Sequence, residues 1–211
     1  MFNYQHQTAW QPITGRQQSP IDLLTDQATK VHALLPIKTI APYHLDLDTD
    51  DRTTIKVSGT GRITLFQREF SFTQLHFHRP SEHLINGKKS PFEIHFVHQN
   101  DIGQLAVIAL LVPVGNQNLP LQYLIEHFQQ GQQTPIDFHL NDWLPSVPEG
   151  FHYLGSLTTP PLTEGVEWAV ITNHRITISQ QQLDWFKQVF PANNRQVQAL
   201  NKRSLFYYQK H

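Results

Sequence analysis

The sequence predicts a mainly β fold, and three observations support this prediction. Short segments in which apolar and polar residues alternate recur along the chain, as expected of strands with one buried face. Residues 105–112 form an unbroken apolar run, which is typical of a central strand covered on both faces. Only two segments show helical spacing. Because 211 residues can bury a substantial core and the 14 prolines are scattered rather than gathered in a linker, we expect one domain over residues 1–211.

The predicted strands follow one another with few interruptions. Ser58-Gly59-Thr60-Gly61 is expected to form the turn between the first two strands. A loop with Pro80 and Asn86-Gly87 joins the third strand to the fourth. In chain order, the predicted strands are residues 53–57, 62–66, 74–78, 92–98, 105–112, 166–171 and 175–178.

Two helices are predicted in the second half of the chain. Residues 121–130 carry leucine, isoleucine and phenylalanine at helical spacing, and Gly131 is expected to end this helix. Ser179 is the expected N-cap of a second helix that runs to about residue 189, with apolar residues on one face.

Composition excludes several functional classes. A net charge of −1 gives no basic surface, so we expect no nucleic-acid partner. No apolar run reaches about eighteen residues, so no membrane span is expected. The polar start and the absence of cysteine favour a cytoplasmic protein. A leader removed before residue 1 would instead make the protein periplasmic or secreted.

Three histidines on two neighbouring predicted strands suggest a metal site. Alternation places His76 and His78 on one face of their strand, and His95 can meet them if the two strands pair antiparallel. An isolated His-x-His is more often incidental, but Gln74 and Glu93 each stand two residues before a histidine, where they can orient its ring. Three neutral nitrogen ligands with a fourth position for water are typical of a catalytic Zn²⁺ site.

Further motifs extend over nearly the whole chain. In chain order they are Gln18-Ser19-Pro20-Ile21-Asp22, Gln74-x-His76-x-His78, Ser81-Glu82-His83, Glu93-x-His95-x-Val97-His98, Ser156-Leu157-Thr158-Thr159-Pro160-Pro161, Trp168 and Asn194-Arg195. With these motifs, which occur in the order of the family, the sequence resembles the α-class carbonic anhydrases. Arg79-Pro80-Ser81-Glu82-His83 followed by Ile85-Asn86-Gly87-Lys88 looks like the bacterial branch. The resemblance implies a large, mostly antiparallel twisted central sheet with a few short peripheral helices.

The resemblance implies a lyase that reversibly hydrates carbon dioxide to bicarbonate and a proton, by attack of zinc-bound hydroxide on CO2. By resemblance, Thr158 accepts the proton of the hydroxide in a hydrogen bond and donates its own to Glu82, which is then an acceptor and not a ligand. The resemblance also implies sulfonamide and anion inhibitors at the zinc, and a homodimer is possible.

A pocket for apolar CO2 is expected beside the metal, and its lining is carried over from the family. Arg62 stands where the resemblance places a proton-relaying histidine, and arginine cannot release its proton. His6 or His44 could substitute, and Tyr4 could line the mouth. The expected pocket residues are Val97, Val107, Leu157, Thr159, Val166 and Trp168.

Two other classes of protein fit part of the pattern. His76-x-His78-x-x-x-Glu82 also matches the metal-binding run of cupins, in which the glutamate is a ligand, iron or manganese is common, and the activity is that of an oxygenase or isomerase. The glycines that bracket a cupin motif are missing, since Phe70 and Lys89 stand in their places. A non-catalytic binding module is the third reading, but no expected ligand has been lost.

Overall fold

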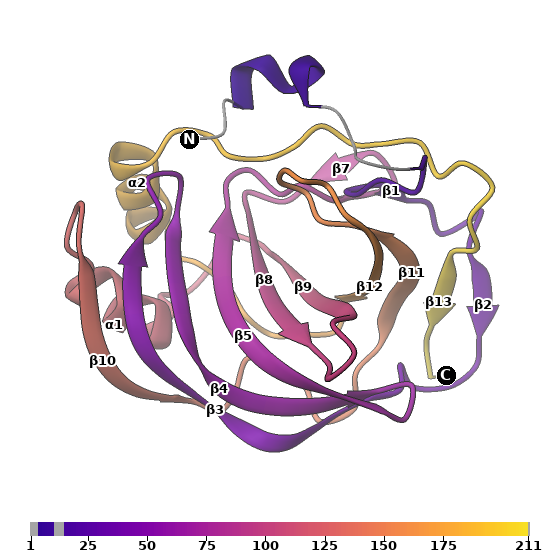
Figure 1. Ribbon diagram of the computed structural model, residues 1–211, viewed down its shortest axis with the longest axis horizontal. Helices are drawn as coiled ribbons and strands as arrows, with labels where there is room; N and C mark the ends of the chain where they lie inside the picture. Colours follow the sequence, from indigo (N-terminus) through magenta and orange to yellow (C-terminus); the bar gives the residue numbers. More distant parts are fainter. Residues whose placement is uncertain (1–3, 11–14, 211) are drawn as a thin grey trace.

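Ten strands form one curved sheet in the computed structural model, which describes residues 4–10 and 15–210 (Figure 1). All neighbouring pairs are antiparallel except β9 with β12 and β13 with β2, which are parallel. The mainly β, mostly antiparallel prediction is therefore confirmed. In sheet order, the strands are β10 (Gln133–Leu140), β3 (Ile37–Asp50), β4 (Ile55–Leu65), β5 (Arg68–His78), β8 (Phe92–Gln99), β9 (Leu105–Val112), β12 (Glu164–Ile171), β11 (Gly150–Ser156), β13 (Phe206–Tyr208) and β2 (Thr29–Val31).

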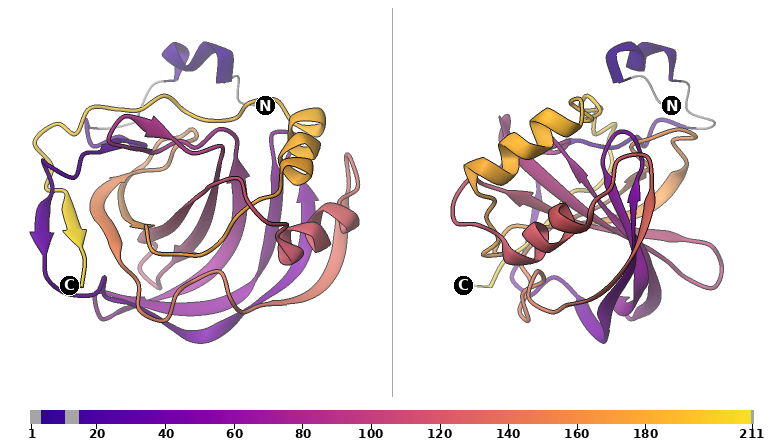
Figure 2. Two further views of the ribbon diagram at one scale, coloured as in Figure 1. Left: turned by 180° about the vertical axis from the view of Figure 1, so that it is seen from behind. Right: turned by 90° about the vertical axis from the view of Figure 1, so that its left-hand side faces the viewer.

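The remaining elements are short and peripheral. A small sheet contains β1 (Asp22–Leu23), β6 (Leu84–Ile85) and β7 (Lys88–Lys89). The helices are the 3-10 helix η1 (Tyr4–Ala9), α1 (Leu119–His127) and α2 (Gln180–Val189). Both α-helices lie towards the β10–β3 side of the sheet (Figures 1 and 2). None of the helices in the described ranges has the length and apolar character needed to cross a membrane.

The turn predicted at residues 58–61 is wrong. β4 continues through these residues, and the chain turns at Phe66 and Gln67, which both have positive φ. Gly59 is needed for another reason: a Cβ there would lie 2.1 Å from the backbone oxygen of His44 on β3. The glycines therefore mark a close approach of two strands in an irregular part of the ladder, a use that sequence does not distinguish from a turn.

Two other predicted boundaries differ from the structure. Residues 175–178 form no strand, and Ile178 makes only an isolated bridge to Val114. Helix α1 ends before Gly131, because Phe128 is extended and its ring packs on Trp185 and Phe190. The N-cap of α2 is confirmed, since the hydroxyl of Ser179 accepts a hydrogen bond from a backbone N–H of the first turn.

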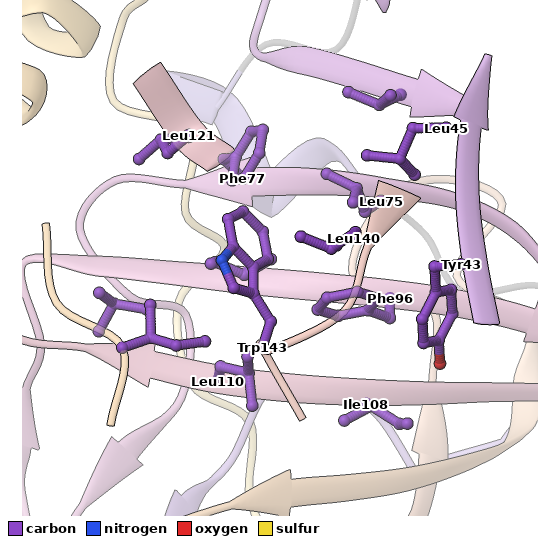
Figure 3. Packing of buried hydrophobic residues seen from close by; sticks show 14 of the residues in the cluster. Tyr43, Leu45, Leu75, Phe77, Phe96, Ile108, Leu110, Leu121, Leu140 and Trp143 are labelled. Atoms are coloured by element: carbon purple, nitrogen blue, oxygen red, sulfur yellow. The ribbon is translucent and has the colours of Figure 1, made fainter. Parts of the chain in front are cut away.

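The main hydrophobic core covers one face of the sheet (Figure 3). Leu75 and Phe77 of β5 and Phe96 of β8 point into it, and the ring of Trp143 packs against Phe96. Because strand side chains alternate, this core fixes the histidines between these residues on the opposite face. A second, smaller cluster on that opposite face includes Val97 and is described with the site.

Asp48 is a buried carboxylate on the main-core face of β3, where it stands opposite Val57. Asp48 is 1% exposed, and neither oxygen of its carboxylate has a hydrogen-bond partner among the described residues. Burial raises the pKa of Asp48 to about 7. The folded protein therefore holds a proton that the unfolded chain releases near pH 4, so this residue makes stability fall as the pH rises from about 4 to about 7.

We expect Asp48→Asn to raise the free energy of unfolding at pH 8 by about 1–3 kcal/mol, because it removes a charge without a partner. At pH 4 the gain should be small. Urea unfolding of both proteins from pH 4 to 8 measures the difference, with exposed Asp46→Asn as the matched control. A gain in stability of equal size at pH 4 and pH 8 would contradict the raised pKa of Asp48.

Candidate metal centre

Three imidazoles converge on the face of the sheet opposite the main core. β5 and β8 pair antiparallel with His76 directly opposite His95, and His78 lies two residues along β5. The ring centroids are 4.9 Å apart for His76 and His78, 5.2 Å for His76 and His95, and 4.5 Å for His78 and His95. One nitrogen from each ring lies within 4.8 Å of the other two. This spacing suits three ligands of one metal ion.

Each ring is oriented through its other nitrogen. Nδ1 of His76 is 2.9 Å from Oε1 of Gln74, and Nδ1 of His78 is 2.9 Å from the backbone oxygen of Asn193. Nε2 of His95 is 2.8 Å from Oε1 of Glu93. These contacts leave Nε2 of His76, Nε2 of His78 and Nδ1 of His95 for a metal. Nε2 of His78 is buried and has no hydrogen-bond partner among the described residues, as expected of an atom that serves as a metal ligand.

Glu93 connects this site to the loop after β5. Its carboxylate is fully buried, and Oε2 accepts the backbone N–H groups of Glu82 and His83 at 2.7 and 2.9 Å. Oε1 lies 2.7 Å from Nδ1 of His83 and 2.8 Å from Nε2 of His95. Burial alone would raise the pKa of Glu93, but the two imidazoles hold it well below its usual value. Glu93 is therefore an ionised acceptor, which orients His95 and increases its basicity.

The electrostatics favour neutral ligands. Burial lowers the pKa of His76, and the adjacent rings of His78 and His95 lower it further. Burial also lowers the pKa of His78. Neutral imidazole is the form that binds a metal, so these rings need to lose no proton at neutral pH.

Glu82 lies beside the histidines but is held by a different group. Its Oε1 accepts the backbone N–H of Arg195 at 2.7 Å. Its Oε2 is 4.0 Å from Nδ1 of His95 and has no hydrogen-bond partner in the described part of the chain. The hydrogen bond expected from Thr158 is thus not formed to Oε2 in this structure. Thr158 is buried in the segment after β11. Oε2 is the oxygen that remains free to accept it.

A cavity of about 90 Å³ opens beside two of the histidines. Thr159 is the one predicted pocket residue in its wall, and Tyr4 lines it as expected. Arg62, which the resemblance places at the position of the proton relay, lines a different cavity, and its guanidinium lies 3.7 Å from Glu69. The described residues around the cavity are Tyr4, Asp51, Thr53, Thr54, Lys56, Gln74, His76, His78, Thr159 and Asn193.

The other predicted pocket residues gather in the second hydrophobic cluster rather than in this cavity wall. The register sets Val97 of β8 opposite Val107 of β9, and Val107 opposite Trp168 of β12. Val166 belongs to the same cluster, and Leu157 packs against it. The indole ring of Trp168 stands edge-on to His95, with centroids 5.0 Å apart. An apolar layer therefore touches the histidine site.

Two residues of the site were not found from the sequence. Asn193 fixes His78 through its backbone oxygen, and its side-chain amide donates to the backbone oxygen of Phe77. Tyr153 has its hydroxyl 2.7 Å from Nε2 of His83 and donates a hydrogen bond to Ser19. These contacts join segments distant in sequence, so no local pattern indicates them.

The donor set fits zinc better than the cupin alternative. Zinc prefers imidazole nitrogen in a tetrahedral arrangement, and His76, His78 and His95 supply three such donors. Glu82 would have to be a ligand in a cupin-like site. Among the described residues, the group of ligand atoms within 4.8 Å of one another at this site contains the three histidines but not Glu82.

The fold and site together define a β protein with a candidate three-histidine metal centre on the central strands of its sheet. The model of the eukaryotic-type carbonic anhydrase family matches residues 4–209, and the chain belongs to this family. A carbonic anhydrase of Pectobacterium atrosepticum is 34% identical over 200 residues, which are 92% of this chain and 81% of that protein.

Two solved structures have the same architecture. An α-carbonic anhydrase of Photobacterium profundum superposes with a TM-score of 0.83 at 33% identity, covering 93% of this chain and 91% of that one. An α-carbonic anhydrase of Thermovibrio ammonificans, in complex with sulfanilamide, gives 0.83 at 34% identity and covers 92% and 88%. The predicted family is confirmed.

Proposed function

We propose that this protein catalyses the reversible hydration of CO2 to bicarbonate and a proton, with Zn²⁺ held by His76, His78 and His95. The observation that carries the proposal is the convergence of three oriented imidazoles, each with one nitrogen left for the ion. Bound zinc supplies a Lewis acid that lowers the pKa of a coordinated water to about 7, a value for which carbonic anhydrase is the standard example, and so provides a nucleophile for CO2.

The residues around the histidines would orient the reacting groups. In this proposal the hydroxyl of Thr158 accepts a proton from the nucleophile in a hydrogen bond and donates its own proton to Oε2 of Glu82. The free Oε2 and its burial support this role, because a buried carboxylate oxygen without a partner needs a donor. Arg195 holds the other oxygen, which keeps the carboxylate in place.

The apolar cluster beside His95 would receive CO2. CO2 has no hydrogen to donate, so it needs no acceptor in the wall of its pocket. An apolar wall of Val97, Val107 and Trp168 can therefore hold CO2 and exclude water. Leu157 and Val166 extend this wall, and Thr159 lines the polar side of the cavity.

Stopped-flow measurement of CO2 hydration tests the proposal. The zinc-loaded protein should hydrate CO2 rapidly, lose the activity when the zinc is removed with a chelator, and regain it when zinc is returned. Sulfanilamide should inhibit, as the complex with the Thermovibrio ammonificans enzyme suggests. No hydration above the buffer rate by protein with a full equivalent of zinc would refute the function. The homodimer and the cytoplasmic location stay predictions.

Added imidazole should accelerate turnover in weak buffer. Among the described residues that line the cavity, the histidines are His76 and His78, and both would be metal ligands. No further histidine of this wall is therefore available to accept the product proton. Thr53→His should raise turnover in weak buffer by up to about 10²-fold, because it adds such a group to the cavity wall. Arg62→His is the matched control and should change nothing, since it lines another cavity. Equal effects of Thr53→His and Arg62→His on turnover would contradict the location of Thr53, but not Arg62, beside the histidines.

A further inference from the structure

A second group of potential metal ligands lies at the outer edge of the sheet. It contains His44 of β3 with Asp137 and His139 of β10, and we refer to these three residues as the edge cluster. One ligand atom from each lies within 4.8 Å of the other two. Nε2 of His44 is 2.7 Å from Oδ1 of Asp137, and the two imidazole rings stack at a centroid distance of 4.6 Å and an angle of 22°.

The backbone brings these side chains to one face. His44 and His139 are directly opposite each other in the ladder between β3 and β10. Asp137 and His139 are two residues apart, so they share a face, while Phe138 between them packs against the main core. The ladder is irregular between Pro135 and Phe138, a stretch that includes Asp137, and the contact of Asp137 with His44 shows that its carboxylate lies on the histidine side. Register and alternation therefore produce the cluster, in contrast to side chains that meet by chance on a flexible loop.

The surroundings suit an ion that keeps some of its water. β10 is the terminal strand of the sheet (Figure 1), so no further strand pairs with it on its outer side in the described structure. The side chains of His44 and Asp137 are 38% and 87% exposed. The hydrogen bond from His44 and the nearby imidazoles lower the pKa of Asp137, so its carboxylate is ionised. The cluster thus presents two nitrogen donors and one anionic oxygen with solvent beside them.

We propose that His44, Asp137 and His139 bind a divalent transition-metal ion, with water in the remaining positions. Two imidazoles and a carboxylate favour Cu²⁺, Zn²⁺ or Ni²⁺ over Ca²⁺ or Mg²⁺, which prefer oxygen ligands alone. Bonds of about 2.0–2.2 Å to each donor require the Nε2–Oδ1 contact to open slightly, which exposed side chains permit. The ion then takes the place of the hydrogen bond between His44 and Asp137, with the imidazole proton of His44 on Nδ1.

This second site is separate from the three-histidine centre. None of its residues lines the cavity beside His76 and His78. It requires no CO2 hydration and depends on no residue of the proposed zinc centre, so it can be tested whatever the activity of the protein.

Titration of the zinc-loaded protein with Cu²⁺ tests the proposal. We expect one further equivalent to bind, with nitrogen couplings in the electron paramagnetic resonance spectrum and the original zinc retained by elemental analysis. His139→Ala and Asp137→Asn should each weaken this equivalent at least tenfold. His32→Ala, which removes an exposed histidine outside the cluster, should leave it unchanged.

Two outcomes would overturn the proposal. The first is that no copper binds beyond what displaces zinc. The second is an extra equivalent that survives both cluster variants or is weakened equally by His32→Ala. Because β10 could unfold locally in a variant, the thermal midpoint of each protein is measured without copper, and His44→Gln provides a second cluster variant that preserves side-chain size.

Discussion

His95→Ala is expected to lower CO2 hydration by about 10³-fold or more and to prevent stoichiometric zinc binding. His95 supplies one of three ligand nitrogens, and its ring touches both other imidazoles and Trp168. Without the ion, the pKa of the water to be ionised lies far above neutral rather than at about 7, so little nucleophile forms at neutral pH. Stopped-flow hydration and zinc content measured on the same preparation give both results.

Loss of folding must be separated from loss of the ligand. His95 is buried and hydrogen-bonded to Glu93, so its removal also leaves the buried carboxylate of Glu93 with one hydrogen-bond donor fewer. His76→Ala is the second variant, because His76 is less buried and its partner Gln74 is uncharged. Near-UV circular dichroism checks that both variants fold. A folded, zinc-free variant with wild-type hydration would refute the metal centre.

Glu93→Gln is expected to weaken zinc binding by about 10- to 100-fold and to destabilise the folded protein by about 1.5–3 kcal/mol. Glu93 accepts two backbone N–H groups at Oε2, and Oε1 contacts His83 and His95. Glutamine keeps one oxygen, but its NH2 group must face donors on the other side. The change therefore affects the orientation of a ligand and the attachment of the Glu82–His83 loop together.

Gln74→Ala is the matched control for Glu93→Gln. Gln74 orients His76 by one hydrogen bond and is only partly buried, so its loss should weaken zinc binding with little effect on stability. Competition with a chromophoric chelator gives zinc affinity, and urea unfolding of the zinc-free proteins gives stability. Equal destabilisation by the two variants would contradict the central role of Glu93.

The histidine pattern shows why a metal centre can be predicted from sequence. Strand alternation is a local property, so His76 and His78 must share a face once they lie in one strand. The apolar residues between them, Leu75 and Phe77, then fix which face is buried in the main core. Gln74 and Glu93 follow from the same alternation, because each lies two residues from a ligand on its own strand.

Glycines and loop residues mark the limit of this reasoning. Gly59 in a polar segment predicts a turn, yet it serves a close contact with β3 that only the assembled sheet creates. The resemblance places Arg62 near the site, whereas Arg62 lines another cavity, and Thr53, in the connection between β3 and β4, lies in the wall of the cavity beside the histidines. A single inserted residue in a ladder changes which side chains face the site.

By itself, the sequence determined the β class, the face of the strands that carries the three histidines, and the family. These depend on alternation and on motifs, which are local or ordered along one chain. Only the tertiary structure decided which groups complete the site, such as Asn193 on His78 and Arg195 on Glu82, and that His44 meets His139. Such contacts join residues far apart in sequence, and their positions depend on strand register and bulges, which local patterns do not encode.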